Sequence, residues 1–240
     1  MPGLYKDEGI VLKTMKLGEA DRIVTLFMRD NGKVRAVAKG IRKTKSRFGG
    51  RLEPYTRVSL LVYRGRNLDT ITSVDIVTSG KEVRVDYERL VAASALADLV
   101  DKVTPDNERA PSVYGLLVAG LEALGTHGAT TVVPAFAVKL LSISGYHPQL
   151  SVCAGCGDGV PLGAFSPAMG GAVCERCGLE DHGAVVMPAD RIGLLARLLA
   201  SDFGVVGDDS ATSELTHALR RYAEYHLERP LRSLELLSAP

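Results

Sequence analysis

The sequence predicts an α+β chain of two domains: a five-stranded β-barrel, then an all-helical domain with an inserted four-cysteine ribbon. Three observations predict this fold. Apolar residues alternate with a period of two through the first 80 residues, the period changes to about 3.6 from Tyr87 onward, and all four cysteines lie between positions 153 and 177. We therefore place the domains at residues 1–80 and 81–240, with the ribbon at about 150–180.

The first domain contains five runs with the alternation and the β-branched residues of half-buried strands. These runs are Glu8–Leu17, Arg22–Met28, Val34–Lys39, Thr56–Tyr63 and Leu68–Val77. Short turns separate them, except for a long basic loop at Gly40–Pro54. A small five-stranded sheet must protect its edges, and a Greek-key barrel of the OB-fold type does so. Periodicity alone leaves an SH3-like barrel as the alternative.

The second domain carries the helical period everywhere outside the cysteine region. The predicted helices run from Tyr87 to near Pro105, and over Val113–Leu124, Thr130–Ser144, Pro188–Ser201 and Ser213–Leu227. The second and third of these helices are unusually apolar, so we expect them at the centre of the helical core.

The cysteines form two Cys-x-x-Cys pairs, Cys153 with Cys156 and Cys174 with Cys177, separated by 17 residues. This spacing is typical of zinc sites in which four thiolates hold the ion tetrahedrally. Because four thiolates leave no open position for water, we expect one structural zinc ion without a catalytic role. Iron or an iron-sulfur cluster is the main alternative. Free thiols, or a redox-active pair, explain two matched pairs less well.

The net charge of +1 conceals a split, because residues 1–80 carry +8 and residues 81–240 carry −7. Eleven lysines and arginines, against one acidic residue, lie between Lys33 and Arg66. This density predicts a nucleic-acid partner whose binding weakens with salt. Phe48 and Tyr55 lie among these charges and are candidates for stacking on bases, although Tyr55 also fits the barrel core. The absence of a base-reading motif favours contacts to the nucleic-acid backbone.

Neither a phosphate-binding Gly-Lys-Ser/Thr loop nor a Gly-x-Ser-x-Gly nucleophile turn is present, and we expect no enzymatic activity. His147 and His182 flank the cysteine region. We expect them at the surface or behind the ligands, because four cysteines already complete a tetrahedron. An apolar run of about 18 residues is also lacking, and the N-terminus does not have the order of a signal peptide. These features predict a protein that stays inside the cell, without a membrane partner.

Short stretches in both domains carry a family resemblance. They are Tyr5–Lys13, Gly18–Val24, Ala38–Gly40, Lys45–Phe48 and Leu52–Tyr55, followed around the cysteine pairs by Leu140–Leu141, Gly145–Pro148, Phe165–Ser166 and Gly170–Gly171. In order and spacing they resemble the zinc-containing members of the bacterial RecO family of recombination mediators. Most of the chain agrees with that pattern, while residues 84–130 and the last 50 residues are only generally similar.

The resemblance implies an OB-fold that binds single- and double-stranded DNA. RecO-like proteins anneal complementary strands, act with RecR, and help RecA to displace single-strand-binding protein, which implies a place at the nucleoid in the bacterial cytoplasm. The DNA contacts that it assigns lie in the matching basic stretch: Lys39, Arg42, Lys43, Lys45, Arg47 and Arg51.

The resemblance also implies that the helical domain holds the acidic tail of single-strand-binding protein. The candidates, on charge alone, are Arg220, Arg221, Arg229 and Arg232, although the sequence favours ordinary surface and helix-end arginines at these positions.

Two competing functions belong to other classes. A zinc-ribbon adaptor whose barrel binds RNA or the ribosome would show a strong preference for RNA. A small nuclease or redox enzyme would show an activity that one carboxylate or cysteine substitution abolishes.

Overall fold

The computed structural model describes residues 3–127, 129–205 and 207–237. The chain divides into two compact units, Met1–Leu121 and Glu122–Pro240. None of the described helices is long and apolar enough to cross a membrane.

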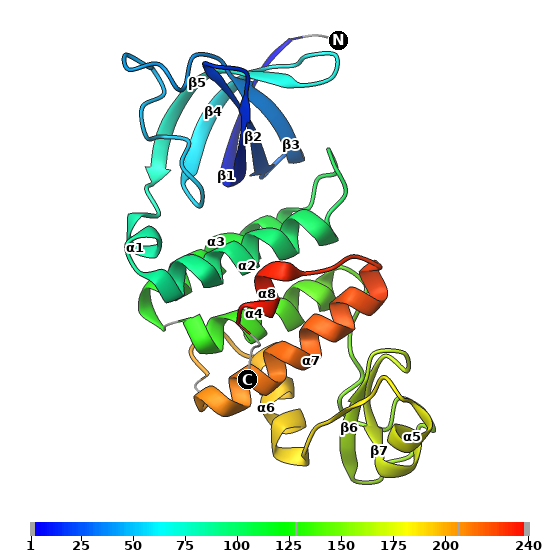
Figure 1. Cartoon of the computed structure of the whole chain (residues 1–240). Helices are drawn as coiled ribbons and strands as arrows, with labels where there is room; N and C mark the ends of the chain where they lie inside the picture. Colours follow the sequence, from blue (N-terminus) through cyan, green and yellow to red (C-terminus); the bar gives the residue numbers. More distant parts are fainter. Residues whose placement is uncertain (1–2, 128, 206, 238–240) are drawn as a thin grey trace. The chain divides into compact units, whose positions relative to one another are not determined.

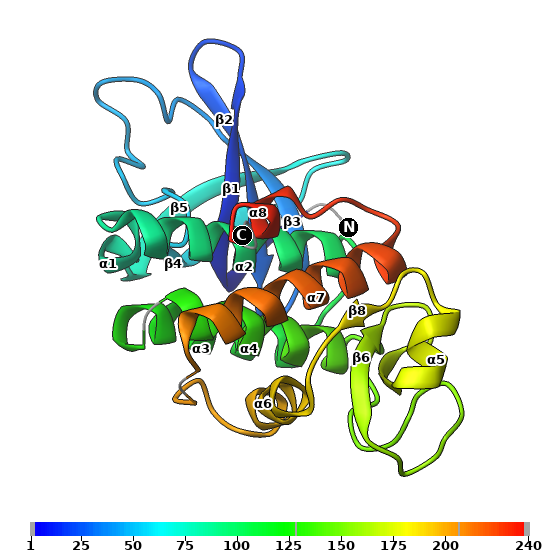
Figure 2. The ribbon, with the colours of Figure 1, turned by 60° about the horizontal axis from the view of Figure 1, so that its bottom comes forward.

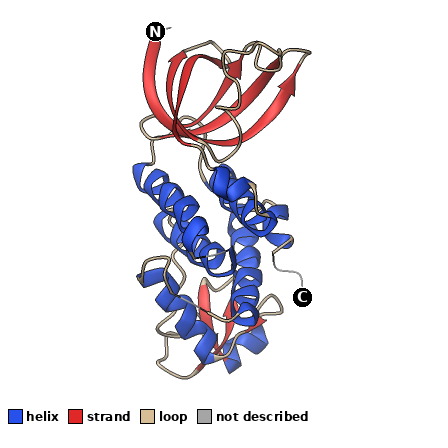
Figure 3. Ribbon diagram, turned by 90° about the vertical axis from the view of Figure 1, so that its left-hand side faces the viewer, coloured by secondary structure: helices blue, strands red, loops and turns tan. Residues whose placement is uncertain are grey.

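The N-terminal barrel closes through the strand order β1-β2-β3-β5-β4, with β4 paired back to β1 (Figure 1; strands are red in Figure 3). Its strands are β1 (Leu4–Leu17), β2 (Asp21–Met28), β3 (Gly32–Ala38), β4 (Arg57–Tyr63) and β5 (Asp69–Thr78). Neighbours are antiparallel except β3 and β5, which pair in parallel at Ala36↔Asp69 and Val37↔Thr70. This topology confirms the predicted OB-fold and replaces the SH3-like alternative.

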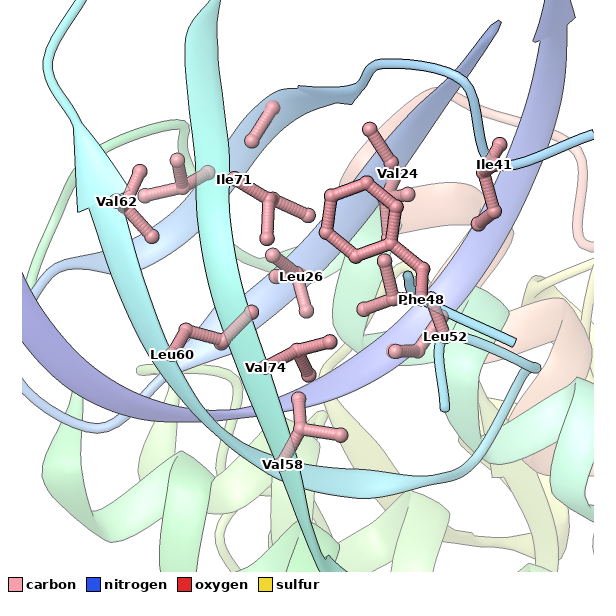
Figure 4. Packing of buried hydrophobic residues seen from close by; sticks show 14 of the residues in the cluster. Val24, Leu26, Ile41, Phe48, Leu52, Val58, Leu60, Val62, Ile71 and Val74 are labelled. Atoms are coloured by element: carbon pink, nitrogen blue, oxygen red, sulfur yellow. The ribbon is translucent and has the colours of Figure 1, made fainter. Parts of the chain in front are cut away.

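The barrel core combines residues of all five strands with three residues of the loop between β3 and β4, namely Ile41, Phe48 and Leu52. Figure 4 shows the ring of Phe48 beside Val24 and Ile71 inside the barrel. Because these loop residues are at most 8% exposed, the loop is part of the core and not a free connection. Burial of side chains of this size contributes roughly 1.5–3 kcal/mol each.

Helices α1 (Lys81–Arg84) and α2 (Tyr87–Val103) belong to the same compact unit as the barrel. The carboxylate of Asp86 caps the start of α2 by accepting a hydrogen bond from the backbone N–H of Arg89 at 2.9 Å. An N-cap of this kind stabilises a helix by about 1 kcal/mol. The compact unit therefore extends beyond the residues of the barrel and into helix α3 (Pro111–Thr126).

A buried lysine on β3 joins the barrel to the end of α2. Lys33 Nζ donates hydrogen bonds to the carbonyl oxygens of Asp101 at 2.5 Å and Thr104 at 2.7 Å. A cation at this position complements the negative end of the helix dipole. The turn before it requires Gly32, where φ is 66° and a Cβ atom would lie 1.8 Å from the carbonyl oxygen of Glu108.

The second unit contains helices and a small three-stranded sheet. Its elements are α4 (Ala129–Ile143), β6 (Leu162–Ser166), β7 (Gly171–Cys174), α5 (Glu175–Glu180), β8 (Val185–Val186), α6 (Ala189–Ala200), α7 (Asp209–Leu227) and α8 (Arg232–Glu235). Helix α4 is buried along most of its length and packs against α6 and α7 (Figure 2). Lys139 on α4 donates to the carbonyl oxygens of Leu199 and Ser201, so it caps the end of α6.

The sheet has the order β7-β6-β8. Strands β6 and β7 lie in the segment predicted as a ribbon, whereas β8 lies just beyond its predicted end at about residue 180. Strands β6 and β7 form an antiparallel hairpin between the two cysteine pairs, as the glycine-rich stretch indicated. The predicted order of barrel, helices and inserted cysteine ribbon is therefore confirmed.

Candidate nucleic-acid interface and metal centre

The six predicted DNA-contact residues all lie on the loop between β3 and β4. They are Lys39, Arg42, Lys43, Lys45, Arg47 and Arg51, and each is exposed. The apolar residues that alternate with them point into the barrel core. The loop therefore separates its residues by chemistry, with the aliphatic and aromatic side chains inside and the cations outside. We call residues 39–56 the basic loop.

Hydrogen bonds fix the start of the basic loop to the turn between β1 and β2. Arg42 donates to the carbonyl oxygens of Gly18 at 3.1 Å and Glu19 at 2.8 Å. The backbone N–H of Gly40 donates to the carboxylate of Asp21 at 2.7 Å. The loop is thus held both by its core residues and by polar contacts at its base.

The cations of the basic loop differ in how many contacts they make with other groups of the protein. Arg51 donates to the carbonyl oxygen of Arg47 at 2.8 Å, and the Arg47 guanidinium lies 4.9 Å from the centre of the Phe48 ring. Among the described residues, the ammonium groups of Lys39, Lys43 and Lys45 form no ion pair, and all three side chains face solvent. These three lysines are the charges most available to an external anion.

Several other cations of the basic stretch are neutralised within the fold. Lys33 is buried, Arg35 pairs with Asp106 at 2.6 Å, and Arg57 pairs with Glu8 at 2.6 Å. The hydrogen bond from Arg35, and after it the one from Lys33, lowers the pKa of Asp106 below its ordinary value. The charge count along the sequence therefore overstates the charge that a ligand meets.

The proposed stacking role of Phe48 is wrong. Its side chain is 1% exposed and lies in the barrel core, because the end of the barrel needs an apolar residue to close it. Tyr55 is half-buried with a left-handed φ of 66°, and burial raises the pKa of its hydroxyl. Neither Phe48 nor Tyr55 therefore presents a fully exposed ring on which a base could stack.

The four cysteines meet in one cluster, with their sulfur atoms within 4.8 Å of one another. A tetrahedron with metal–sulfur bonds of 2.3 Å requires sulfur–sulfur separations of about 3.8 Å, so small movements of the side chains suffice to close on an ion. Cys174 ends β7 and Cys177 lies in α5, whereas the first pair lies on the turn before β6. The donor set is that of a closed, thiolate-ligated metal site.

The backbone around the first pair is shaped to bring its sulfurs to the second pair. The N–H of Gly157 donates to the carbonyl oxygen of Cys153 at 2.8 Å, and the N–H of Cys174 lies 3.3 Å from the Cys153 sulfur. A Cβ atom at Gly155 would lie 3.0 Å from the sulfur of Cys177. Glycine is therefore needed where the two pairs approach each other.

The thiols have unequal acidity. Burial disfavours the thiolate of Cys153, but N–H groups of Cys156 and Cys174 outweigh it and lower the pKa to about 6. Burial and the neighbouring sulfurs raise the pKa of Cys177 to about 12. Four thiolates therefore require a cation among them, and metal binding must release protons.

His147 and His182 are exposed and lie outside the cysteine cluster. His147 Nδ1 lies 2.7 Å from the hydroxyl of Ser142. Among the described residues, the candidate metal centre thus offers sulfur ligands alone.

The four arginines proposed for an acidic tail are spread over α7 and the segment after it. Arg220 pairs with Glu224 at 3.5 Å, while Arg221, Arg229 and Arg232 are exposed. Arg220 also lines a groove with His217 and the apolar Met187. That groove includes the carboxylates of Asp209, Glu214 and Glu235. Its charge is therefore poorly suited to an acidic peptide.

Known proteins share both halves of this arrangement. Residues 1–79 match the family model described as recombination protein O N terminal, and residues 84–235 match recombination protein O C terminal. A protein of Nocardioides sp. named DNA repair protein RecO is 44% identical over 96% of this chain and 98% of its own length. Proteins of the same name from Frankia casuarinae and Streptomyces avermitilis are 44% and 42% identical, over 98% and 96% of this chain and 98% and 97% of theirs. The chain therefore belongs to the RecO family of DNA repair proteins.

Proposed function

We propose that the protein binds single- and double-stranded DNA through the basic loop and anneals complementary strands without turnover chemistry. The observation that carries the proposal is the set of six exposed cations on a loop whose apolar residues are buried in the barrel. Cations that replace condensed counterions bind any phosphate backbone and do so in a salt-dependent manner.

The loop suits annealing because its cations contact phosphates and leave the base edges free. Two single strands repel each other through their backbones, and bound lysines and arginines reduce that repulsion. The buried anchors and the contact of Arg42 with the β1–β2 turn keep the cations at fixed positions. The protein would thus hold two strands near each other while their bases pair.

The partners follow from membership of the family. We propose that the protein acts with RecR and promotes the loading of RecA on strands coated by single-strand-binding protein, at the nucleoid in the cytoplasm. In this division of labour, residues 1–80 bind DNA and residues 81–240 contact protein partners. The acidic groove on α7 does not suit the tail of single-strand-binding protein, so exposed arginines such as Arg221, Arg229 and Arg232 are better candidates.

For the metal we propose a single structural zinc ion held by Cys153, Cys156, Cys174 and Cys177. Four sulfurs from two Cys-x-x-Cys pairs are the ordinary donor set for zinc, which they would bind without an open coordination position. The ion would supply a crosslink within the ribbon at about 150–180, and would take no part in DNA chemistry. Metal analysis of the purified protein distinguishes zinc from iron.

The proposed function is tested by a strand-annealing assay with two complementary labelled oligonucleotides, one of them coated with cognate single-strand-binding protein. The assay is run at several salt concentrations with the full chain and with RecR added or omitted. Acceleration that falls with salt is expected, because phosphate contacts are lost as salt rises.

Each alternative gives a different result in the same experiment. A strong preference for RNA over DNA of the same sequence, without annealing, would favour the adaptor function. Cleavage of the oligonucleotides would favour a nuclease. Folded, metal-loaded protein that accelerates nothing would overturn the annealing proposal.

A further inference from the structure

Strand β8 lies at an edge of the three-stranded sheet and pairs with β6 on one side only. Val185 is the register partner of Phe165, and the N–H of Met187 donates to the carbonyl oxygen of Gly163 at 3.0 Å. In an antiparallel ladder, such hydrogen-bonded positions alternate with positions whose backbone groups face away. The N–H and C=O of Val186 therefore point away from β6, and no other described segment forms a hydrogen bond with them.

A groove runs along this edge, with helix α7 as its second wall. It is the acidic groove on α7, with a volume of about 850 Å³, and Val185, Val186 and Met187 form its strand side. Successive side chains of an extended segment point to opposite faces, so only a groove at the edge can be bordered by all three. Val186 is 85% exposed, whereas Met187 is 2% exposed and forms part of the apolar floor. All of these residues belong to one compact unit.

The helical wall of the acidic groove carries a net negative charge. Three carboxylates line the groove, those of Asp209, Glu214 and Glu235. The guanidinium of Arg220 also lines it and pairs with Glu224 at 3.5 Å. His217 adds no charge at neutral pH, because burial and then the nearby Arg220 and Arg221 lower its pKa.

A cation beside the groove does not remove this excess. Arg191, near the start of α6, pairs with Glu214 at 3.2 Å. It also pairs with Asp190 at 3.0 Å and with Asp208 at 3.7 Å. One guanidinium shared by three carboxylates leaves negative charge for a ligand to meet.

We propose that the acidic groove binds a partner protein through an extended basic segment, which adds to the sheet as a strand beside β8. The backbone of the segment pairs with the N–H and C=O of Val186. Its apolar side chains pack on Val185 and Met187, and its lysines or arginines reach Asp209 and Glu214. In this mode of recognition the main-chain hydrogen bonds supply affinity, and the walls of the groove select the side chains.

This interaction goes beyond the proposed function and does not depend on DNA binding by the barrel. Charge complementarity selects the occupant, since a groove lined by carboxylates repels an acidic segment and attracts a basic one. The second unit would thus have a docking site for a basic partner in addition to its exposed arginines.

The test uses the full chain and a short fluorescent peptide in which lysine and valine alternate, with binding followed by fluorescence anisotropy. Two comparison peptides carry glutamate in place of lysine, or methyl groups on alternate backbone nitrogens. The lysine–valine peptide is expected to bind at low salt. The others should bind roughly tenfold more weakly, because one has the wrong charge and the other lacks N–H groups for strand pairing.

Val186→Pro removes the outward N–H and keeps the pairing of β6 with β8, since proline is tolerated on an edge strand when its nitrogen faces solvent. It is expected to weaken peptide binding roughly tenfold. Val186→Thr is the matched control, because it keeps the N–H and nearly the same shape, and it should bind within about twofold of the parent. Unchanged metal content and thermal unfolding of both variants show that the ribbon is intact.

The charge of the groove is tested separately. Asp209→Asn combined with Glu214→Gln should weaken binding of the lysine–valine peptide roughly tenfold and flatten its salt dependence. The control is Glu82→Gln combined with Glu88→Gln, which removes two exposed carboxylates of the other compact unit and should change nothing.

A readout at the paired atom completes the test. The amide proton of Val186 has no partner in the free protein, so it should exchange rapidly with solvent. Its exchange, measured by NMR, should slow when the lysine–valine peptide is bound.

Several outcomes would overturn the proposal. They are failure of the folded, metal-loaded chain to bind the basic peptide, tighter binding of the glutamate peptide, and binding that Val186→Pro leaves unchanged. If the chain self-associates, and Val186→Pro and the combined Lys43→Ala, Lys45→Ala and Arg47→Ala variant both abolish the association, the occupant is the basic loop of a second copy and the separate partner is overturned. The proposed function stands in each of these cases, because strand annealing is measured on the barrel.

Discussion

The basic loop and the cysteine ribbon are both long, glycine-containing segments, yet they are held in opposite ways. The basic loop inserts Ile41, Phe48 and Leu52 into an existing barrel core. The ribbon has a small core of its own, in which three of the five buried residues are cysteines. The loop therefore uses the hydrophobic effect of its host domain, whereas the ribbon depends on its thiols.

The difference shows that what stabilises a segment depends on whether apolar residues of its domain surround it. A loop across the end of a barrel finds apolar partners on every side, and its polar residues are free for binding. A hairpin with few large apolar residues cannot offset the entropy of ordering by burial alone, and the proposed metal crosslink would take the place of the missing core.

The largest effect should come from removing metal ligands. The variant Cys153→Ser with Cys156→Ser is expected to lose the ion and unfold the ribbon, because structural zinc contributes about 10–16 kcal/mol of binding free energy to folding in small domains. Metal content by mass spectrometry and limited proteolysis of the segment after Gln149 measure this. Double-stranded DNA binding by the barrel should persist. Retained metal and an unchanged proteolysis pattern would contradict the idea that the ribbon depends on its thiols.

Removing an anchor of the basic loop should have the next largest effect. Phe48→Ala leaves a cavity in the barrel core and is expected to cost about 3–5 kcal/mol of unfolding free energy, measured by urea denaturation. Phe48→Leu keeps most of the volume and should cost less. The ribbon of the same variant should retain its metal. Equal stability of the parent and Phe48→Ala would show that the loop does not hold the barrel closed.

Neutralising the charges should change binding without changing stability. Lys43→Ala, Lys45→Ala and Arg47→Ala combined are expected to weaken DNA binding and reduce the salt slope for duplex DNA by up to about 2.7. Each side chain is exposed, so the unfolding free energy should change by no more than about 0.5 kcal/mol per site. Lys81→Ala, at an exposed lysine outside the loop, is the control. An unchanged salt slope would show that DNA binds a surface other than the basic loop.

The smallest effect concerns the acid sensitivity of the link between the barrel and α2. The depressed pKa of Asp106, held down by Arg35 and Lys33, means that its contribution is present above the unfolded value of about 4 and is lost as pH falls through the lower folded value. Asp106 is partly exposed, so the effect should be below about 1 kcal/mol. Unfolding free energies measured from pH 7 to pH 3 should fall less for Asp106→Asn. Parallel curves would contradict this.

The strands and long helices could be predicted because their periodicity is local. Strands β2, β4 and β5 lie within one residue of the predicted bounds. Two starts were missed by four residues each: β1 begins at Leu4 and not at Glu8, and α7 begins at Asp209 and not at Ser213. The helices α1, α5 and α8, of four to six residues, give too short a pattern to detect. The meeting of the four cysteines followed from their spacing, because the ligand chemistry fixes it.

The errors arose where a residue's partners come from distant parts of the chain. An aromatic residue in a charged loop looks exposed in sequence, and only the barrel closure shows why Phe48 is buried. In the sequence, Lys33 looked like one more surface cation. In the structure it caps the end of helix α2, and its two acceptors lie 68 and 71 residues further along the chain.

The short parallel pairing of β3 and β5 has a consequence for motion. This seam has only two register pairs, whereas every other seam of the barrel has at least seven. Amide protons along it should therefore exchange with solvent before those of the antiparallel seams, since opening breaks the fewest backbone hydrogen bonds there. The basic loop starts where β3 ends. The barrel should therefore open locally next to the cations that we propose bind DNA.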